Sequence, residues 1–150
     1  MTKKILIAIV VLLVVIQFWP VSLPEVSNNN PNDLIANNEI AADIQSILKT
    51  SCYDCHSNET VYPWYSYVAP VSFLVVRDIN EGREHLNFSE WNSLSKLDMA
   101  EALDELSEEV EEGEMPMAIY LPMHPEASLS DQDKEKLATW AENFAEALFE

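Results

Sequence analysis

The sequence predicts an all-α domain of four to five helices, preceded by a separate apolar helix at the N-terminus. Three observations lead to this fold class. Apolar residues recur at helical spacing in several segments. Only two glycines occur in 150 residues, whereas β-rich folds need many tight turns. No segment of the sequence is a convincing strand. A chain of this length has room for one compact domain with an appendage.

The N-terminus has the features of a membrane anchor. Lys3 and Lys4 precede an apolar run over residues 5–19, which only Gln17 interrupts. Extending the run to Leu23 gives nearly the length of about 20 residues that a transmembrane helix needs. No Ala-x-Ala-like cleavage site follows, so the pattern favours an uncleaved anchor over a cleaved signal peptide. Both alternatives send the rest of the chain across the membrane, because the lysines stay on the cytoplasmic side.

The chain therefore divides into residues 1–23 as a membrane anchor or signal segment, residues 24–38 as a linker rich in Asn, Pro and Ser, and residues 39–150 as the domain. We expect a single-pass protein of the bacterial inner membrane with its C-terminal domain in the periplasm. The chain has eight basic and 26 acidic residues and a formal net charge of −18. Such a surface repels phosphate and excludes nucleic acid as a partner. The sequence also lacks the patterns of a hydrolase or kinase.

Each helix of the domain is predicted from an apolar stripe together with a start or stop signal. The predicted helices cover residues 39–50 with Asn37 or Asn38 as cap, 70–86, a short segment around Trp91, 96–112, and Ser130 to Leu148. Pro70 suits a first helical turn, and Gly113 is a stop signal. Ser130 and Asp133 have the spacing of a capping box. Between these last helices, residues 114–129 are predicted to form a structured, proline-containing loop.

The segment Cys52-Tyr53-Asp54-Cys55-His56 contains the only two cysteines of the chain. Two thiols three residues apart on a tight helical turn can add to the two vinyl groups of haem, and the adjoining histidine is then placed to bind the iron. The sequence therefore predicts one covalent haem c, attached through Cys52 and Cys55, with His56 as the proximal ligand of its iron.

Other chemistries of this motif stay open at this point. A Cys-x-x-Cys pair also forms structural disulfides and thiol redox centres, although the thioredoxin-like version expects a βαβ context. A zinc site would need further ligands, for which His85 or His124 would have to serve. The predicted export agrees with haem attachment, which takes place outside the bacterial cytoplasm in c-type cytochromes generally.

Several residues near the motif are candidates to contact haem. Tyr62 and Trp64 could pack on the macrocycle, with ordinary core packing as the alternative. Arg77 could meet a haem propionate or instead pair with neighbouring acids; the same choice holds for Arg83. The Pro63 carbonyl is the candidate to orient the second ring nitrogen of the haem-ligating histidine.

The second axial ligand of the iron is predicted to be Met115. This residue stands in Gly113-Glu114-Met115-Pro116, after a helix stop and before the proline-containing loop, where the backbone can present a side chain without helical constraint. A thioether at this position raises the reduction potential of the iron. The alternatives are His124, Met117 or Met123, and an open sixth position.

These motifs together resemble class I cytochromes c and, more narrowly, the small membrane-anchored haem-binding-domain proteins of Bacteroidota. The resemblance covers almost the whole predicted exported part. It rests on four segments, namely residues 52–58 (Cys-Tyr-Asp-Cys-His-Ser-Asn), Tyr62-Pro63-Trp64-Tyr65, residues 85–89 (His-Leu-Asn-Phe-Ser), and Gly113-Glu114-Met115-Pro116 with His124 shortly after. It implies a cytochrome c-like helical fold around a haem.

The function expected from this pattern is that of a membrane-anchored electron carrier, not an enzyme, which exchanges electrons with redox partner proteins on the periplasmic side. The alternative is a haem-based sensor or a peroxidase-like protein whose sixth ligand is absent or displaceable.

Overall fold

The computed structural model describes residues 2–150, and within this range the chain is all-helical, without a strand. The all-α part of the predicted fold class is confirmed. The α-helices are α1 (Thr2–Ile16), α2 (Leu34–Asn37), α3 (Ala42–Ser51), α4 (Tyr53–His56), α5 (Val71–His85), α6 (Lys96–Glu112) and α7 (Asp131–Ala147). Three short 3-10 helices join them, η1 (Trp64–Tyr67), η2 (Phe88–Ser93) and η3 (Pro125–Ala127).

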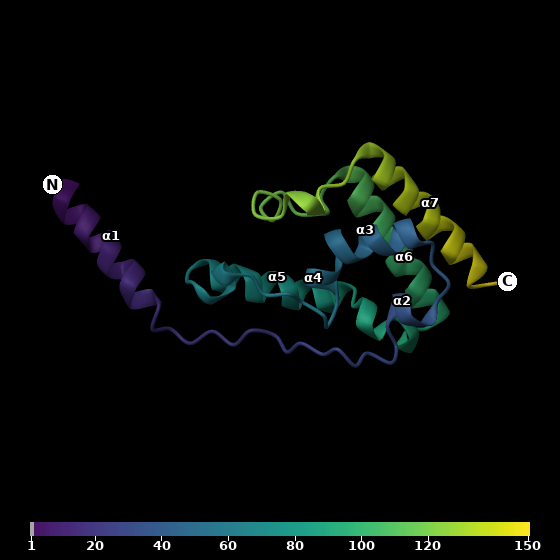
Figure 1. The fold of residues 1–150 in the computed structure, drawn as a ribbon, viewed down its shortest axis with the longest axis horizontal. Coiled ribbons are helices and arrows are strands. Elements are labelled where there is room, and N and C mark those ends of the chain that lie inside the picture. Colours follow the sequence, from purple (N-terminus) through teal and green to yellow (C-terminus); the bar gives the residue numbers. More distant parts are fainter. Residues whose placement is uncertain (1) are drawn as a thin grey trace.

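The N-terminal helix α1 stands apart from the domain (Figure 1) and has no buried residue. It ends at Ile16 after 15 residues, and an extended chain with Pro20 follows. At 1.5 Å per residue the helix is about 22 Å long, against about 30 Å for the hydrocarbon core of a bilayer. Within residues 2–150, no helix combines the length and the apolar character needed to span a membrane. The prediction of a transmembrane helix over residues 1–23 is therefore not supported.

The segment predicted to be a linker, residues 24–38, lies along the domain in the structure. The Tyr62 hydroxyl donates a hydrogen bond to the Pro24 carbonyl at 2.7 Å, and Arg83 donates one to the Glu25 carbonyl at 2.9 Å. Further along, Leu34 is fully buried in the core. These contacts join residues far apart in sequence, so the polar composition of the segment did not reveal them.

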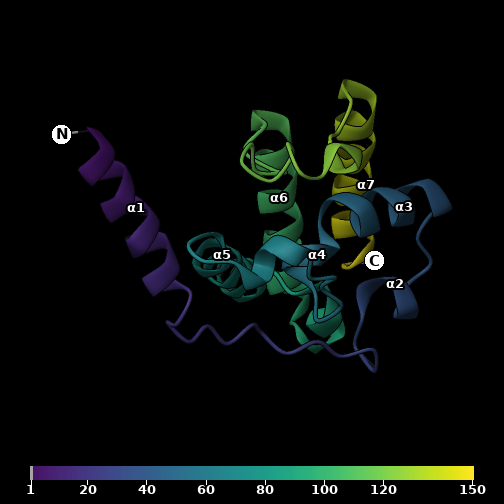
Figure 2. The same ribbon diagram turned by 60° about the vertical axis from the view of Figure 1, so that its left-hand side comes forward.

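The core lies between α6, α7 and α3. Figure 2 shows α6 and α7 side by side, and they run in opposite directions because the loop after α6 returns the chain to the start of α7. The largest fully buried side chains come from several of the packed elements, namely Trp91, Phe88, Leu34, Leu48, Leu103 and Leu137. Burying such side chains is the main source of stability for a domain of this size.

The ends of the two long helices agree with the sequence signals. Gly113 ends α6 in the left-handed conformation at φ 80°, which glycine adopts without strain. Ser130 and Asp133 form a capping box at the start of α7. The start of α3 differs from the prediction: Asp33 caps a separate turn, α2, so that Asn38 ends that turn instead of starting α3.

Candidate haem site

The cysteine motif forms a single helical turn at the junction of α3 and α4. The Cys52 amide donates to the Leu48 carbonyl at 3.0 Å, which continues α3 up to the motif. The amides of Cys55 and His56 both donate to the Cys52 carbonyl, at 3.2 and 2.9 Å. Both cysteines carry free thiols. The tight turn predicted from the spacing is therefore present.

Helix α5 packs directly against this turn, and Gly82 makes the close approach possible. A Cβ atom at position 82 would lie 3.0 Å from the Cys55 carbonyl oxygen and 3.3 Å from its carbon. These contacts would be tighter than nine in ten of those that real Cβ atoms make, so the absence of a side chain at Gly82 allows α5 to lie this close to the motif.

The imidazole of His56 is held by the C-terminal end of α5. Its Nδ1 atom lies 3.0 Å from the Leu86 carbonyl oxygen, which fits an Nδ1–H donor and leaves Nε2 for an iron. Burial lowers the pKa of His56, so the ring is neutral at physiological pH, the form that binds metals. The carbonyl expected from the sequence was that of Pro63. The structure supplies Leu86 instead, because α5 carries this carbonyl back to the motif.

A cavity of about 290 Å³ borders the motif, with Asp54 and Cys55 in its wall. It lies between α5 with the segment before it and the loop that follows α6. Most of its lining is apolar or aromatic and includes Tyr62, Trp64, Leu74, Ile79, Met117 and Met123. Cys55 lines this cavity, whereas Cys52 and His56 belong to the same helical turn but lie outside the lining. An apolar cavity that borders this turn suits the apolar face of a porphyrin, so the residues present fit a haem.

The residues predicted to contact haem do not all lie at the cavity. Tyr62 and Trp64 line the cavity. Arg77 lies outside the lining, on an exposed face, where it pairs with Asp78 at 2.7 Å and Glu81 at 3.7 Å. This ion pairing was the alternative considered for Arg77.

Arg83, the other cation considered for a propionate, serves as an internal brace. Its guanidinium donates to the Ser57 carbonyl at 2.8 Å and to the Thr60 hydroxyl at 3.0 Å, besides the bond to the segment before α2. Arg83 therefore connects the loop after the motif to the segment before α2.

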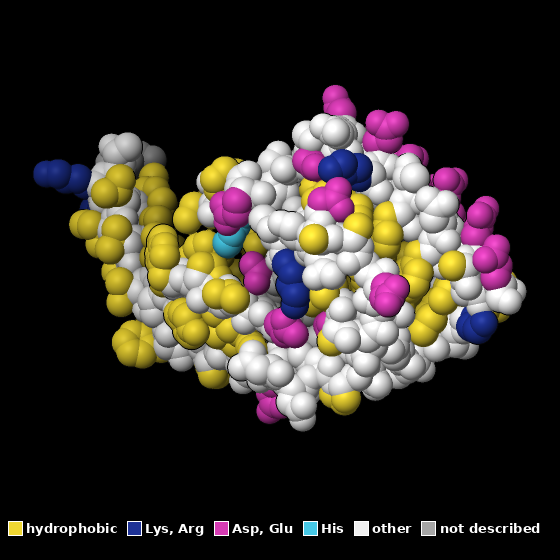
Figure 3. Space-filling model, turned by 45° about the vertical axis from the view of Figure 1, so that its right-hand side comes forward, with side chains coloured by type: hydrophobic (Ala, Val, Ile, Leu, Met, Phe, Trp, Pro, Cys, Tyr) yellow, Lys and Arg dark blue, Asp and Glu magenta, His cyan; other side chains and the backbone are white. Residues whose placement is uncertain are grey.

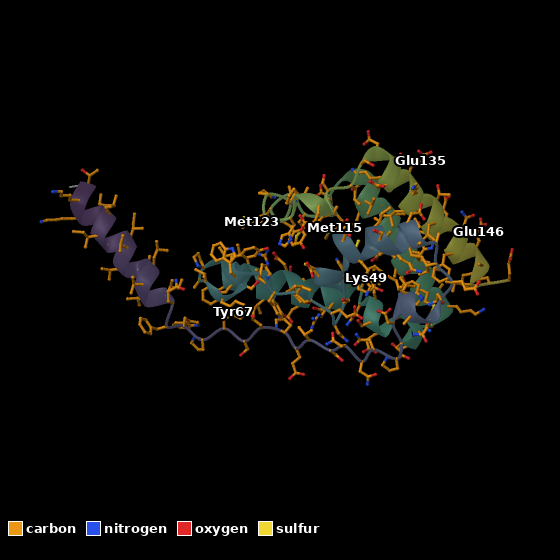
Figure 4. The ribbon with its side chains drawn as sticks, viewed as in Figure 1. Lys49, Tyr67, Met115, Met123, Glu135 and Glu146 are labelled. Carbon is orange, nitrogen blue, oxygen red and sulfur yellow. The ribbon has the colours of Figure 1, made fainter. Side chains whose placement is uncertain are left out.

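The candidates for a second axial ligand lie in two places. Met115 is half-buried and packs against the core, as Cys52 does, and its amide donates to the Glu109 carbonyl at 3.1 Å. Met117, Met123 and His124 line the cavity, whereas Met115 is outside its lining. In Figure 4, Met115 lies at the base of the loop near α3, and Met123 lies farther out, above α5.

A polar cluster that the sequence analysis missed ties the loop after α6 to the motif. The Tyr120 hydroxyl donates to the Asp54 carboxylate at 2.8 Å. The Tyr120 ring stacks on His124 with the ring centroids 4.0 Å apart, and the Tyr65 hydroxyl is hydrogen-bonded to His124 Nε2. These partners are 59 and 66 residues apart in sequence, so no periodicity could have revealed them. The only sequence feature that pointed to this cluster is that Asp54 and Tyr65 belong to the segments on which the family resemblance rests.

The two thiols are poor candidates for dithiol redox chemistry. Burial raises the pKa of Cys52 to about 12 and, with a contribution from Asp54, that of Cys55 to about 11. Thiol redox centres instead have lowered pKa values, because the thiolate is the reactive form. Among residues 2–150, no three His, Cys, Asp or Glu side chains are grouped so that they could hold a metal ion, so the zinc alternative finds no ligand set there.

The raised pKa values give a direct prediction for the chain before haem attachment. At mildly alkaline pH both thiols are protonated, so alkylation by iodoacetamide should be roughly tenfold or more slower than for an ordinary thiol. The rate should increase as the pH approaches 11, the pKa region of Cys55. Mass spectrometry of the alkylated peptide measures the rate, and the same chain in denaturant is the control. Equal rates in the folded and denatured chain would contradict the prediction.

Comparison with known proteins identifies the family. The family model described as a haem-binding domain matches residues 11–143, a range that includes the cysteine motif, the cavity and the loop after α6. No curated protein and no solved structure matches the chain significantly. Since the match covers most of the chain and contains the residues that fit a haem, the protein belongs to the haem-binding-domain family.

Proposed function

We propose that this haem-binding protein is a c-type cytochrome that carries one covalent haem and transfers electrons on the periplasmic side of a bacterial inner membrane. The observation that carries the proposal is the attachment turn. Two free thiols lie one helical turn apart, and a buried neutral imidazole with one nitrogen engaged by backbone follows them directly. Haem supplies an iron that takes up and releases one electron.

The chain's own residues attach the haem, orient the histidine ligand and line the cavity. The sulfurs of Cys52 and Cys55 form the thioether bonds that prevent loss of haem. His56 binds the iron through Nε2, while the Leu86 carbonyl holds its ring in one orientation. The cavity wall would present mostly apolar side chains to a bound haem, and a less polar environment there would favour the less charged form of the iron site.

The test of this proposal uses protein matured in a periplasm. Haem should stay with the denatured chain on a gel stained for haem peroxidase activity. It should also be reduced by dithionite and reoxidised by ferricyanide over repeated cycles. Colourless protein, or haem that leaves the chain on denaturation, would contradict the proposal.

We propose Met115 as the second axial ligand, because it packs against the same core as Cys52 and comes from the loop that Tyr120 ties to the motif. Met115→Ala should abolish the weak far-red absorption band of ferric thioether-ligated haem, whereas His124→Ala should keep it. Absorption spectra of both variants make the comparison. A band that survives in Met115→Ala and disappears in His124→Ala would instead assign the ligand to His124.

A second candidate function is a haem-based sensor or peroxidase-like protein, and one observation favours it. His124 lies in the cavity wall, hydrogen-bonded to Tyr65 and 3.3 Å from the Glu126 carboxylate, so a polar group capable of proton transfer borders the same cavity as Cys55. A high-spin ferric spectrum with ready binding of carbon monoxide would select this candidate, and a low-spin spectrum that resists carbon monoxide would reject it.

For the location, we propose that the N-terminal segment holds the domain at the outer face of the inner membrane. In support, α1 buries no residue, begins with two lysines in its first turn, and is apolar on all sides over residues 5–16. The expected partners are redox proteins and not nucleic acid, given the net charge of −18.

A further inference from the structure

Three segments at one end of the molecule contain no charged residue. The chain has eight basic and 26 acidic residues, yet residues 5–24, 61–76 and 115–123 contain none of them. In Figure 1, the latter two segments project from the domain toward the side where α1 lies. Figure 3 shows hydrophobic side chains over α1 and the adjoining end of the domain, with a few acidic side chains beside them, while many acidic side chains line the opposite end.

A pair of hydrogen bonds joins the first two of these segments. The Gln17 side chain donates from Nε2 to the Ala69 carbonyl at 2.8 Å, and the Ala69 amide donates to Gln17 Oε1 at 3.1 Å. Gln17 is the residue that directly follows α1, and Ala69 lies just before α5. These two bonds place the end of the apolar helix beside residues 61–76 of the domain.

The surface around this attachment is apolar, aromatic and exposed. We call it the uncharged face and define it by Trp19, Val61, Trp64, Tyr67, Ile119 and Met123. Trp64 is 70% exposed and Tyr67 is 67% exposed. Four of its members, Val61, Trp64, Ile119 and Met123, also line the cavity beside Cys55. Exposed apolar surface of this kind marks an interaction site, and Trp and Tyr are the residues that prefer the boundary between lipid and water.

We propose that the uncharged face lies on the lipid surface of the membrane, so that the mouth of the cavity meets the bilayer. The inference rests on the proposed membrane association of the N-terminal segment. Lipid is favoured as the occupant because the face continues, through the bonded pair of Gln17 and Ala69, into α1, whose residues 5–16 are apolar on all sides. The acidic remainder of the domain is repelled by anionic headgroups, and this orientation keeps it in water.

Photo-crosslinking of the full chain, carrying haem, tests the proposal. The protein is reconstituted into phosphatidylcholine vesicles whose acyl chains carry a diazirine, and irradiated adducts are mapped by mass spectrometry of peptides. We expect adducts in α1 and also in residues 61–76 and 115–123. In Trp64→Glu/Tyr67→Glu, adducts in the two domain segments should be lost, while adducts in α1 persist as an internal control.

The matched control is Leu97→Glu. Leu97 is also 70% exposed, but it lies next to Lys96, which is hydrogen-bonded to Leu148 near the C-terminal end of α7, away from the uncharged face. This variant should keep all adducts. Adducts confined to α1 in the wild-type protein would overturn the docking of the domain and leave the membrane association intact. Adducts in no segment would overturn the membrane association as well.

Discussion

Replacing Cys52 and Cys55 together with alanine should leave the denatured chain without haem, a complete loss on a gel stained for haem. Each thiol forms one of the two covalent links, so the double variant retains only the bond between iron and His56, which does not survive denaturation. Each single variant should retain haem through the remaining thioether, at reduced yield. Absorption at the haem band relative to protein gives the yield of attachment.

Thr50→Ala is the control for these variants. Thr50 lies on α3, two residues before the motif, and is exposed, so its removal tests whether a change next to the turn affects haem by itself. We expect wild-type haem content. Haem that remained with the denatured double variant would show attachment elsewhere and would exclude the proposed role of both sulfurs.

Gly82→Val should destabilise the domain by about 1–3 kcal/mol, the usual cost of forcing atoms into a packed interior. Helix propensity alone would not predict a loss, because glycine is itself a poor residue inside a helix. The cause is the contact with the motif: a Cβ at this position meets the Cys55 carbonyl oxygen at 3.0 Å, and the valine methyl groups add to the clash. Urea unfolding monitored by circular dichroism measures the change in the free energy of unfolding.

The same substitution should also lower haem content. Helix α5 carries the Leu86 carbonyl that orients His56, so moving α5 away from the motif moves the histidine's partner. Asn80→Val is the matched control, because Asn80 is exposed on the same helix and a valine there costs only helix propensity, less than about 1 kcal/mol. If Gly82→Val and Asn80→Val behaved alike, the close packing of α5 would have no role in the haem site.

The local features of the site were predictable because they depend on neighbouring residues. The spacing of Cys52 and Cys55 implies one helical turn wherever the motif is helical, and the backbone bonds to the Cys52 carbonyl show that turn. Gly113 ends α6 for a similarly local reason, since glycine adopts a positive φ without strain. The all-α fold follows from periodicity, which is also a local property.

The long-range partners were not predictable. Leu86 and not Pro63 faces the ring of His56, because the path of α5 decides which carbonyl returns to the motif. The bonds from Tyr120 to Asp54 and from Tyr65 to His124 join segments of the cavity wall that share no repeating pattern. The composition of a segment and the spacing of its residues do not predict such long-range hydrogen bonds, because these depend on how the helices pack.

The sequence by itself determined the all-helical class, the attachment turn with its two thiols and histidine, and the strongly negative net charge. Only the tertiary structure decided that the segment after α1 lies against the domain, that the Leu86 carbonyl faces His56, and that Arg83 is bonded to the loop after the motif. The physical reason is the range of the interactions. Helical hydrogen bonds and capping act within about four residues, whereas cavity walls and hydrogen bonds between distant segments exist only once those segments have packed.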